Sequence, residues 1–197
     1  MSPISTSQQA LTAITGGIGS GKSYICRLLA QRGIDVYDCD AAAKRLMLTS
    51  GPLKRQLQEL VGKDVYDAKG QLQKDVLRRY LLTDERHKQA VNEVVHPAVA
   101  ADFLQSGHTW LESAILFDSG FYQRLPLTHV VCVAAPLETR IARVMARDGI
   151  SREKALQWIG SQWPQDEVMA RSQYVIVNDE GSPLEEQIEN IINEMRG

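Results

Sequence analysis

Eight residues near the beginning of the chain carry the strongest chemical signal in the sequence. Gly16 to Ser23 reads G-x-x-x-x-G-K-[ST], the pattern of a loop that holds the phosphates of a nucleotide. Glycines let such a backbone curl around an anion with its N–H groups pointing inward. The Lys22 ammonium would reach the β- and γ-phosphates, and the Ser23 hydroxyl would ligate Mg²⁺. The pattern predicts a nucleoside triphosphate site formed by Gly17, Ile18, Gly19, Ser20, Gly21, Lys22, Ser23 and Tyr24.

The segments on both sides of the loop favour the same interpretation. Residues 10–15 are short and largely apolar, as in a buried parallel strand, and residues 24–30 are apolar at helical spacing. A helix that begins at the loop presents the positive end of its dipole to the bound anion. Strand, loop and helix therefore follow one another in the order that phosphate binding requires.

Composition limits the classes of protein to which the chain could belong. Of its 197 residues, 44% are hydrophobic and 23% are charged, so the chain is able to bury a core. The formal net charge of −2 disfavours a nucleic-acid partner, and no apolar run is long enough to span a membrane. Three cysteines without a C-x-x-C pair, and a polar N-terminus without an apolar signal region, indicate a cytoplasmic protein. Residues 1–9 are expected to form a flexible extension.

The rest of the chain predicts alternating strands and helices. Further strands are expected at 33–37, 109–113, 129–134 and 173–177, where short apolar runs lie between turn signals. This alternation predicts an α/β fold of the P-loop NTPase type, with a parallel sheet of about five strands flanked by helices.

Two helical insertions divide the predicted core, which covers about 10–40, 106–139 and 173–197. The first insertion covers about 41–105 and the second about 140–172. Within the first, a helix from about Asp84 meets His96-Pro97, where it either ends or continues with a kink.

Four carboxylates come at or just after the predicted strand ends. Because ligands of such sheets bind beyond the carboxyl ends of the strands, Asp38, Asp40, Glu112 and Asp118 should converge near Lys22. Either Asp40 or Asp38 is placed to act as a general base, and the alternative is that Asp40 caps a helix beginning at Ala41. Glu112 could hold Mg²⁺ through water, and Asp118 is a weaker candidate. The alternative for Glu112 and Asp118 is a surface or capping role.

Three arginines after the fourth predicted strand share one helical face. Arg140, Arg143 and Arg147 lie three and four residues apart. They could form a solvated basic stripe. They could also belong to a lid whose arginine neutralises the charge of a phosphoryl group in transfer and excludes water.

Taken together, these motifs resemble the dephospho-coenzyme A kinase family through nearly the whole chain. The matching pieces are Thr15 to Ser23, Asp38-Cys39-Asp40, Gly70 to Leu77, His96-Pro97, Ile115 to Asp118, Arg143 with Arg147, Gln162 and Asn178. Any one of them apart from the loop is weak evidence, whereas their order and spacing together are specific.

The resemblance implies a single P-loop kinase domain at 10–197 and a reaction. The γ-phosphoryl group of ATP would pass, with Mg²⁺ present, to the ribose 3′-hydroxyl of dephospho-coenzyme A, giving coenzyme A and ADP. The insertion at 41–105 would bind this acceptor, and the segment at 140–172 would close as the lid. The roles implied are Asp40, Lys22 and Arg147 in catalysis, Ser23 and Glu112 at the metal, Asn178 near the adenine, and Asp40, Lys74 and His96 at the acceptor.

The chain departs from the family pattern at five positions. Tyr24 replaces a usual threonine, Lys74 an arginine, Asp118 a glutamate, Arg140 a glutamine and Gln173 an aspartate. These changes concern details of acceptor binding more than the activity itself. The exchange at position 74 keeps the positive charge but loses the bidentate fork of arginine.

Three other kinds of protein share parts of this sequence pattern. A small-molecule kinase of the nucleoside-monophosphate type would have similar insertions, so the acceptor must be tested. A GTP-binding regulatory protein would need an Asn-Lys-x-Asp motif, which the sequence lacks. A nucleotide-binding protein without turnover is disfavoured by the presence of Lys22, Ser23 and Asp40.

Overall fold

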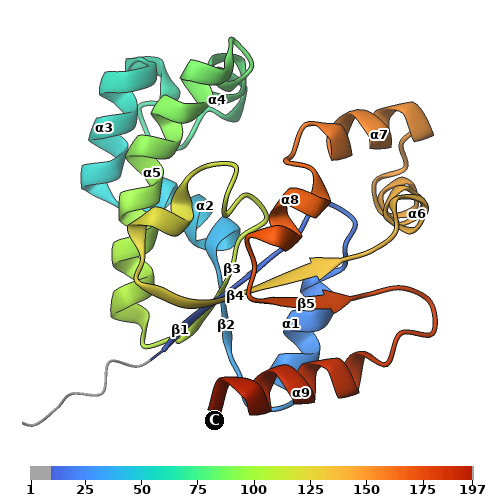
Figure 1. The fold of residues 1–197 in the computed structure, drawn as a ribbon. Helices are drawn as coiled ribbons and strands as arrows, with labels where there is room; N and C mark the ends of the chain where they lie inside the picture. The colour runs from blue at the N-terminus through green and yellow to red at the C-terminus, as the bar shows by residue number, and fades with distance from the viewer. Residues whose placement is uncertain (1–9, 197) are drawn as a thin grey trace, which may run out of the picture. The chain divides into compact units, whose positions relative to one another are not determined.

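A computed structural model describes residues 10–196, so the N-terminal extension predicted at 1–9 lies outside the described residues. The described chain forms a five-stranded sheet in the order β2-β3-β1-β4-β5. Along the sequence, helices connect most of these strands (Figure 1). The strands are β1 (Leu11–Thr15), β2 (Val36–Asp38), β3 (Trp110–Glu112), β4 (Leu127–Ala134) and β5 (Tyr174–Val177). The α-helices are α1 (Lys22–Ala30), α2 (Cys39–Thr49), α3 (Gly51–Val61), α4 (Lys74–Leu81), α5 (Glu85–Ser106), α6 (Leu137–Asp148), α7 (Arg152–Gly160), α8 (Gln165–Ala170) and α9 (Leu184–Arg196). Two short 3₁₀ helices are η1 (Lys63–Val65) and η2 (Phe121–Arg124). The predicted α/β fold with about five strands is confirmed.

The chain divides into two compact units, each with its own core. Of the described residues, the sheet unit contains 10–36, His108–Asp118 and 126–196. The helical unit contains Tyr37–Gly107 and Ser119–Leu125. The boundary falls within β2, so the helical unit includes the aspartates at 38 and 40 together with the predicted insertion.

The central strands of the sheet unit run in parallel. β1 pairs with β3 and with β4, and β4 pairs with β5. Parallel strands end at the same edge of a sheet, so the residues that follow β1, β3, β4 and β5 lie along one edge. That edge carries the glycine loop after Thr15, Glu112 at the end of β3, and Asn178 directly after β5.

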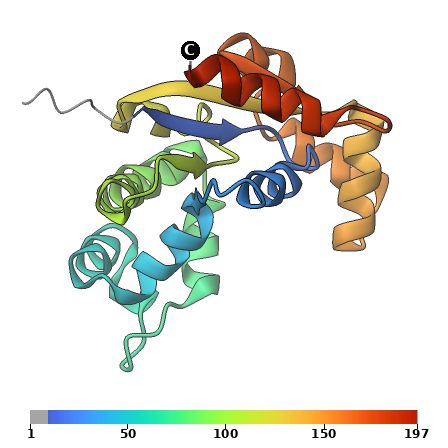
Figure 2. The ribbon, with the colours of Figure 1, turned by 90° about the horizontal axis from the view of Figure 1, so that it is seen from below.

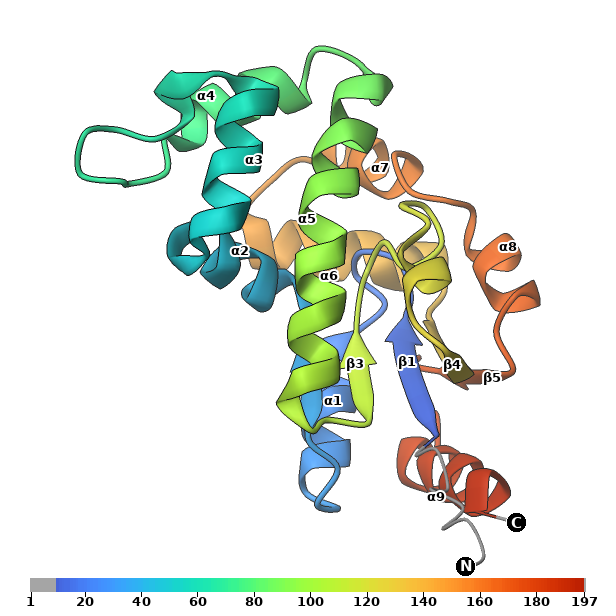
Figure 3. The ribbon, with the colours of Figure 1, turned by 90° about the vertical axis from the view of Figure 1, so that its left-hand side faces the viewer.

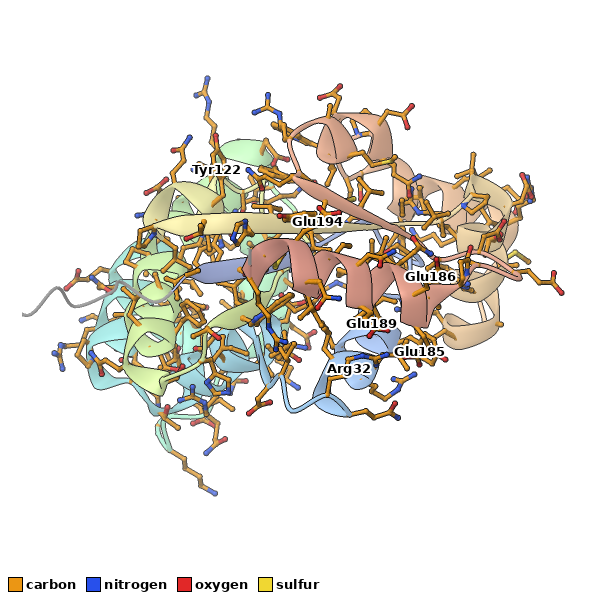
Figure 4. The ribbon with its side chains drawn as sticks, turned by 60° about the horizontal axis from the view of Figure 1, so that its bottom comes forward. Arg32, Tyr122, Glu185, Glu186, Glu189 and Glu194 are labelled. Carbon is orange, nitrogen blue, oxygen red and sulfur yellow. The ribbon has the colours of Figure 1, made fainter. Side chains whose placement is uncertain are left out.

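Helices α1 and α9 share one apolar core with the sheet. Ile25 and Leu28 of α1 and Ile188 of α9 pack with Ile14 of β1 and Val131 of β4. α9 runs along the strands (Figure 2). At the surface the guanidinium of Arg32 pairs with Glu185, and both side chains are visible between α1 and α9 (Figure 4). This packing fixes the direction of α1, at whose N-terminus the loop ends.

The helical unit is organised around the long helix α5. Helices α2 and α3 pack against it, and α3 lies beside α5 in Figure 3. The Tyr37 hydroxyl donates to Asp102 of α5 at 2.6 Å, and Arg45 of α2 donates to the same carboxylate oxygen at 2.6 Å. The Tyr37 ring meets the Phe103 ring edge to face at 5.3 Å. These contacts attach the segment that precedes Asp40 to α5.

Three local features differ from the sequence prediction or decide between its alternatives. The helix expected from Ala41 begins at Cys39, because the Asp38 carboxylate caps it and accepts from the Ala41 N–H at 2.9 Å. The alternative in which Asp40 is the capping residue is therefore wrong. α5 continues through Pro97. The third strand is shorter than predicted and covers Trp110–Glu112 alone.

Candidate functional site

The glycine loop of the sheet unit joins β1 to α1 at the carboxyl edge of the sheet. Gly21, the last residue before α1, has a φ of 92°, which favours glycine over any other residue. A Cβ atom on Gly21 would also lie 2.1 Å from the Asn178 side-chain nitrogen. Both the backbone conformation and the close approach of Asn178 therefore require glycine at this position of the motif.

Lys22 is held between the start of the loop and the end of β3. Its Nζ donates to the Gly16 carbonyl at 2.7 Å and lies 3.6 Å from a Glu112 carboxylate oxygen. The side chains of Lys22 and Glu112 are 10% and 15% exposed, so this ion pair is only slightly screened by solvent. The structure therefore brings together a predicted catalytic residue and a predicted metal ligand.

Asn178 and Arg143 hold the second half of the loop. The Asn178 Nδ2 donates to the Ser20 carbonyl at 2.8 Å, and the Arg143 Nη1 donates to the same carbonyl at 3.2 Å. The Asn178 backbone N–H donates to Ala134 at 2.7 Å, which fixes the residue beyond the paired part of β5. Asn178 is only 5% exposed. The family resemblance implies a position of Asn178 near the adenine, which stays a prediction. The contact of Asn178 with the loop itself was not predicted from the sequence.

Arg140 and Gln162 hold the middle of the loop at Ile18. The Arg140 Nε donates to the Ile18 carbonyl at 3.0 Å, and the Ile18 N–H donates to the Gln162 Oε1 at 2.7 Å. Arg140 is 5% exposed, so it does not belong to a solvated basic stripe, and that alternative is wrong for this residue. Burial lowers the pKa of the Arg140 guanidinium.

Side chains thus bind the carbonyl groups along the loop, and these contacts determine the direction of the neighbouring N–H groups. In a trans peptide the C=O and the N–H point in opposite directions. The carbonyls of Gly16, Ile18 and Ser20 accept from Lys22, Arg140 and Asn178, so the N–H groups of the residues that follow them point the other way. A row of N–H groups next to a helix N-terminus is an anion-binding arrangement. Arg140 and Asn178, both distant in sequence, therefore hold the backbone of the loop in which the motif predicts phosphate binding.

Two further predicted residues of the sheet unit, Arg147 and Asp118, lie in different surroundings. Arg147 forms an ion pair with its neighbour Asp148 at 2.7 Å, and its side chain is 60% exposed. The catalytic role of Arg147 stays a prediction. Asp118, the weaker metal candidate, accepts from the Trp163 N–H at 2.9 Å and so anchors the turn between α7 and α8. The metal-binding, surface and capping interpretations of Asp118 stay predictions.

In the helical unit, Asp40 and Lys74 are both exposed near helix N-termini. Asp40 lies in the first turn of α2, directly after the cap at Asp38. Lys74 is the first residue of α4. Exposure leaves both side chains accessible to a ligand. That Asp40 lies close to Lys22 stays a prediction.

His96 of α5 is a neutral, partly buried imidazole. Its Nδ1 is buried and has no hydrogen-bond partner among residues 10–196. Its ring meets the Phe121 ring edge to face at 5.0 Å. Burial, and secondarily the positive charge of Arg124, lower the pKa of His96 to about 4. His96 therefore offers an uncharged hydrogen-bonding nitrogen rather than a positive charge.

The oxygen donors beside the loop suit a magnesium ion. Ser23 supplies a hydroxyl in the first turn of α1, and Glu112 supplies a carboxylate. Within the described part of the chain, no group of three or more His, Cys, Asp or Glu side chains could form a cage for a metal. Mg²⁺ in kinases is held by one or two protein oxygens together with substrate phosphates, so a small set of oxygen donors fits it. Between residues 10 and 196, no helix has both the length and the apolar character needed to cross a lipid bilayer.

Comparison with known proteins gives one consistent family. A family model described as dephospho-CoA kinase matches residues 10–183. A dephospho-CoA kinase of Bacteroides fragilis is 40% identical over 186 residues, which cover 91% of this chain and 89% of the relative. A dephospho-CoA kinase of Thermus thermophilus is 37% identical over 196 residues, covering 95% and 92%.

Solved structures with the same fold cover nearly the whole chain. The crystal structure of TT1252 from Thermus thermophilus is similar with a TM-score of 0.78 and 33% identity, covering 95% of this chain and 98% of that one. A dephospho-CoA kinase from Campylobacter jejuni has a TM-score of 0.62 at 20% identity, covering 94% and 96%. A shikimate kinase from Acinetobacter baumannii has a TM-score of 0.57 at 17% identity, covering 96% of each chain. The last two comparisons show a shared fold.

Proposed function

The chain belongs to the dephospho-CoA kinase family, and on that premise we propose that its glycine loop binds the ATP with which it phosphorylates dephospho-CoA, with Asp40 as the general base. The family assignment makes the chain a kinase that uses ATP. The roles of individual residues and the use of Mg²⁺ are the proposed part.

The observation that carries the proposal is the set of contacts around the loop. Lys22, Arg140 and Asn178 bind loop carbonyls from three different parts of the chain, so the loop is held in shape before a nucleotide arrives. Catalysis of phosphoryl transfer depends mostly on positioning and on neutralising charge, and a preformed loop supplies the first. Lys22 supplies positive charge at the β- and γ-phosphates.

In the proposed reaction, the ribose 3′-hydroxyl oxygen of dephospho-CoA forms a bond to the γ-phosphorus of ATP. The bond between that phosphorus and the oxygen bridging to the β-phosphate breaks, and ADP leaves. The proton of the hydroxyl passes to the carboxylate of Asp40. Asp40 is exposed, so its carboxylate is accessible to a substrate hydroxyl.

Mg²⁺ would be held by Ser23 and Glu112, and when bound it would neutralise phosphate charge during transfer. In the helical unit, the Lys74 ammonium would attract the phosphates of the acceptor. His96 would donate or accept a hydrogen bond without adding charge, because its pKa is lowered to about 4. Arg147 would act from the lid segment on the transferring group.

A panel of acceptors tests the proposal. The purified protein is incubated with ATP and Mg²⁺ and with dephospho-CoA, AMP, CMP or shikimate, and ADP formation is followed. ADP should form rapidly with dephospho-CoA, and the product should carry its new phosphate on the 3′-oxygen. A preference for a nucleoside monophosphate would instead indicate a kinase of that type. Omitting Mg²⁺ in the presence of a chelator should abolish turnover.

A further inference from the structure

Arg140 is a buried cation at the loop without a carboxylate partner. Its Nε donates to the Ile18 carbonyl, and none of the ion pairs among residues 10–196 includes it. A guanidinium stays protonated in proteins, and burying an uncompensated charge is unfavourable. A bound anion beside Arg140 would remove this penalty.

The free end of the guanidinium lies over the first part of the loop. A Cβ atom built on Gly17 would lie 2.3 Å from the Arg140 Nη2 and 2.9 Å from its Cζ. The Gln162 Oε1, which accepts from Ile18, would lie 3.4 Å from the same point. Within the described chain the two Nη groups form no hydrogen bond to protein, so four N–H donors remain at Gly17.

The direction in which a nucleotide lies in the loop follows from Lys22. Lysine of this motif reaches the β- and γ-phosphates, while the N-terminus of α1 receives the inner phosphates. The Lys22 Nζ lies 2.7 Å from the Gly16 carbonyl, at the start of the loop. The terminal phosphate of a triphosphate therefore belongs at the Gly16–Ile18 end, where Arg140 lies.

The two other cations at the loop are already engaged. Lys22 is paired with Glu112, and Arg143 donates to the Ser20 carbonyl and, at 3.4 Å, to Asn178. Arg140 differs because its Nε fixes its position while both Nη groups remain available. A fixed fork of donors is well suited to the oxygens of a phosphate.

We propose that Arg140 binds the terminal phosphate of ATP through its Nη groups while its Nε holds Ile18, and so makes the loop discriminate ATP from ADP. The proposal rests on the proposed function of the loop as the ATP site. Glutamine is usual at this position in the kinases that the sequence resembles, so Arg140 adds a charge to the site in this chain. ADP lacks the group that the Nη groups would contact, so ADP binding should depend on Arg140 only through the contact that holds Ile18.

The test compares the affinities of ATP and ADP by titration calorimetry in buffer with Mg²⁺ and without any acceptor. Arg140→Gln should weaken ATP binding about tenfold to a hundredfold, which is the usual effect of losing a hydrogen bond to a charged group. ADP binding should fall by a clearly smaller factor, because ADP loses only the effect of the Ile18 contact on the loop. Arg140→Lys, which keeps the charge without the fork, should fall between the wild type and Arg140→Gln for ATP.

Arg152→Gln is the matched control, because it removes the same charge from a half-exposed arginine of the same unit that pairs with Glu138. It should leave both affinities unchanged. Equal losses of ATP and ADP binding in Arg140→Gln would mean that Arg140 only holds the loop, and unchanged ATP binding would mean that it does not act on the nucleotide. Either result overturns the proposal.

Thermal unfolding checks that each variant is folded. If Arg140→Gln does not fold, Arg140→Lys decides by the same comparison: a loss specific to ATP supports the proposal, and an equal or absent loss overturns it. Failure of the proposed kinase function would appear separately, as the absence of ADP formation by the wild type with dephospho-CoA. The binding titration contains no acceptor and is independent of that outcome.

Discussion

The side-chain amide of Asn178 donates to the backbone carbonyl of Ser20 at 2.8 Å, although the two residues are 158 positions apart in the sequence. The contact joins the end of the last strand to the glycine loop that follows the first. Both partners are buried. A buried hydrogen bond to a loop carbonyl restricts a backbone that contains several glycines and would otherwise be flexible.

Replacing Asn178 with alanine should therefore weaken both the fold and nucleotide binding. We expect Asn178→Ala to lower the free energy of unfolding by about 1–3 kcal/mol, because the buried Ser20 carbonyl loses a donor. The KM for ATP should rise, since the loop loses one of the contacts that shape it. Urea unfolding and initial rates measure the two effects. Asn193→Ala, which truncates an exposed asparagine of α9, is the control, and an Asn178→Ala variant as stable and as active as this control would contradict the prediction.

A matched pair of variants separates Asp40 from Asp38. Asp40→Asn should fold and bind ATP but lose at least about 100-fold in kcat, because the amide cannot accept the hydroxyl proton. Asp38→Asn should keep most activity, because asparagine caps a helix nearly as well as aspartate and the hydrogen bond to the Ala41 N–H is preserved. Steady-state rates with saturating ATP and dephospho-CoA provide the measurement. The opposite order of activities would assign the base to Asp38.

Glu112 is expected to control the response to magnesium. Glu112→Gln should raise the Mg²⁺ concentration for half-maximal rate by about tenfold or more, because a carboxylate ligand is replaced by a neutral amide. Asp118→Asn is the control, since its amide oxygen still accepts from the Trp163 N–H. Rates are measured over a series of Mg²⁺ concentrations at fixed ATP. If Asp118→Asn shifts the curve and Glu112→Gln does not, the metal ligand is Asp118.

The buried imidazole of His96 predicts a dependence of stability on pH. Its pKa is lowered from 6.5 to about 4 in the folded protein, so between these values the unfolded chain binds more protons than the folded one. The stability contributed by neutral His96 is fully present above pH 6.5 and is lost as the pH falls toward 4. After allowance for partial exposure we expect a loss of about 2 kcal/mol.

The measurement is urea unfolding of the wild type and of His96→Gln at several pH values between 4 and 7.5. Glutamine does not titrate, so the difference in unfolding free energy between the two proteins isolates the histidine. This difference should shift in favour of the variant as the pH falls. A difference that stays constant across the range would show that His96 is protonated equally in both states.

Most of the sheet could be predicted from the sequence because its signals are local. Short apolar runs between turn residues identified the strands, and the motif at Gly16 to Ser23 fixed the connection to α1. The start of α2 was less well predicted. Aspartates at 38 and 40 are both suitable caps in sequence, and only the backbone conformation of Asp38, with φ of −83° and ψ of 104°, makes it the capping residue.

The arginines of α6 show that local sequence patterns do not predict which side chains of a helix are buried. Spacing correctly placed Arg140, Arg143 and Arg147 on one helix, α6. It could not show that Arg140 would be buried against Ile18 while Arg147 would remain 60% exposed beside Asp148. Which part of a helical face is covered depends on the segments that pack against it, and those segments are remote in sequence.

The sequence alone determined the donor end of the site, since a phosphate-binding loop is a continuous run whose residue types fix its backbone conformation and chemistry. It also determined the family, through the order of motifs along the chain. Only the tertiary structure decided which side chains hold that loop. Arg140, Gln162 and Asn178 reach it across 122 to 158 positions, and such contacts follow from the packing of α6, of the turn after α7 and of β5 rather than from any local pattern.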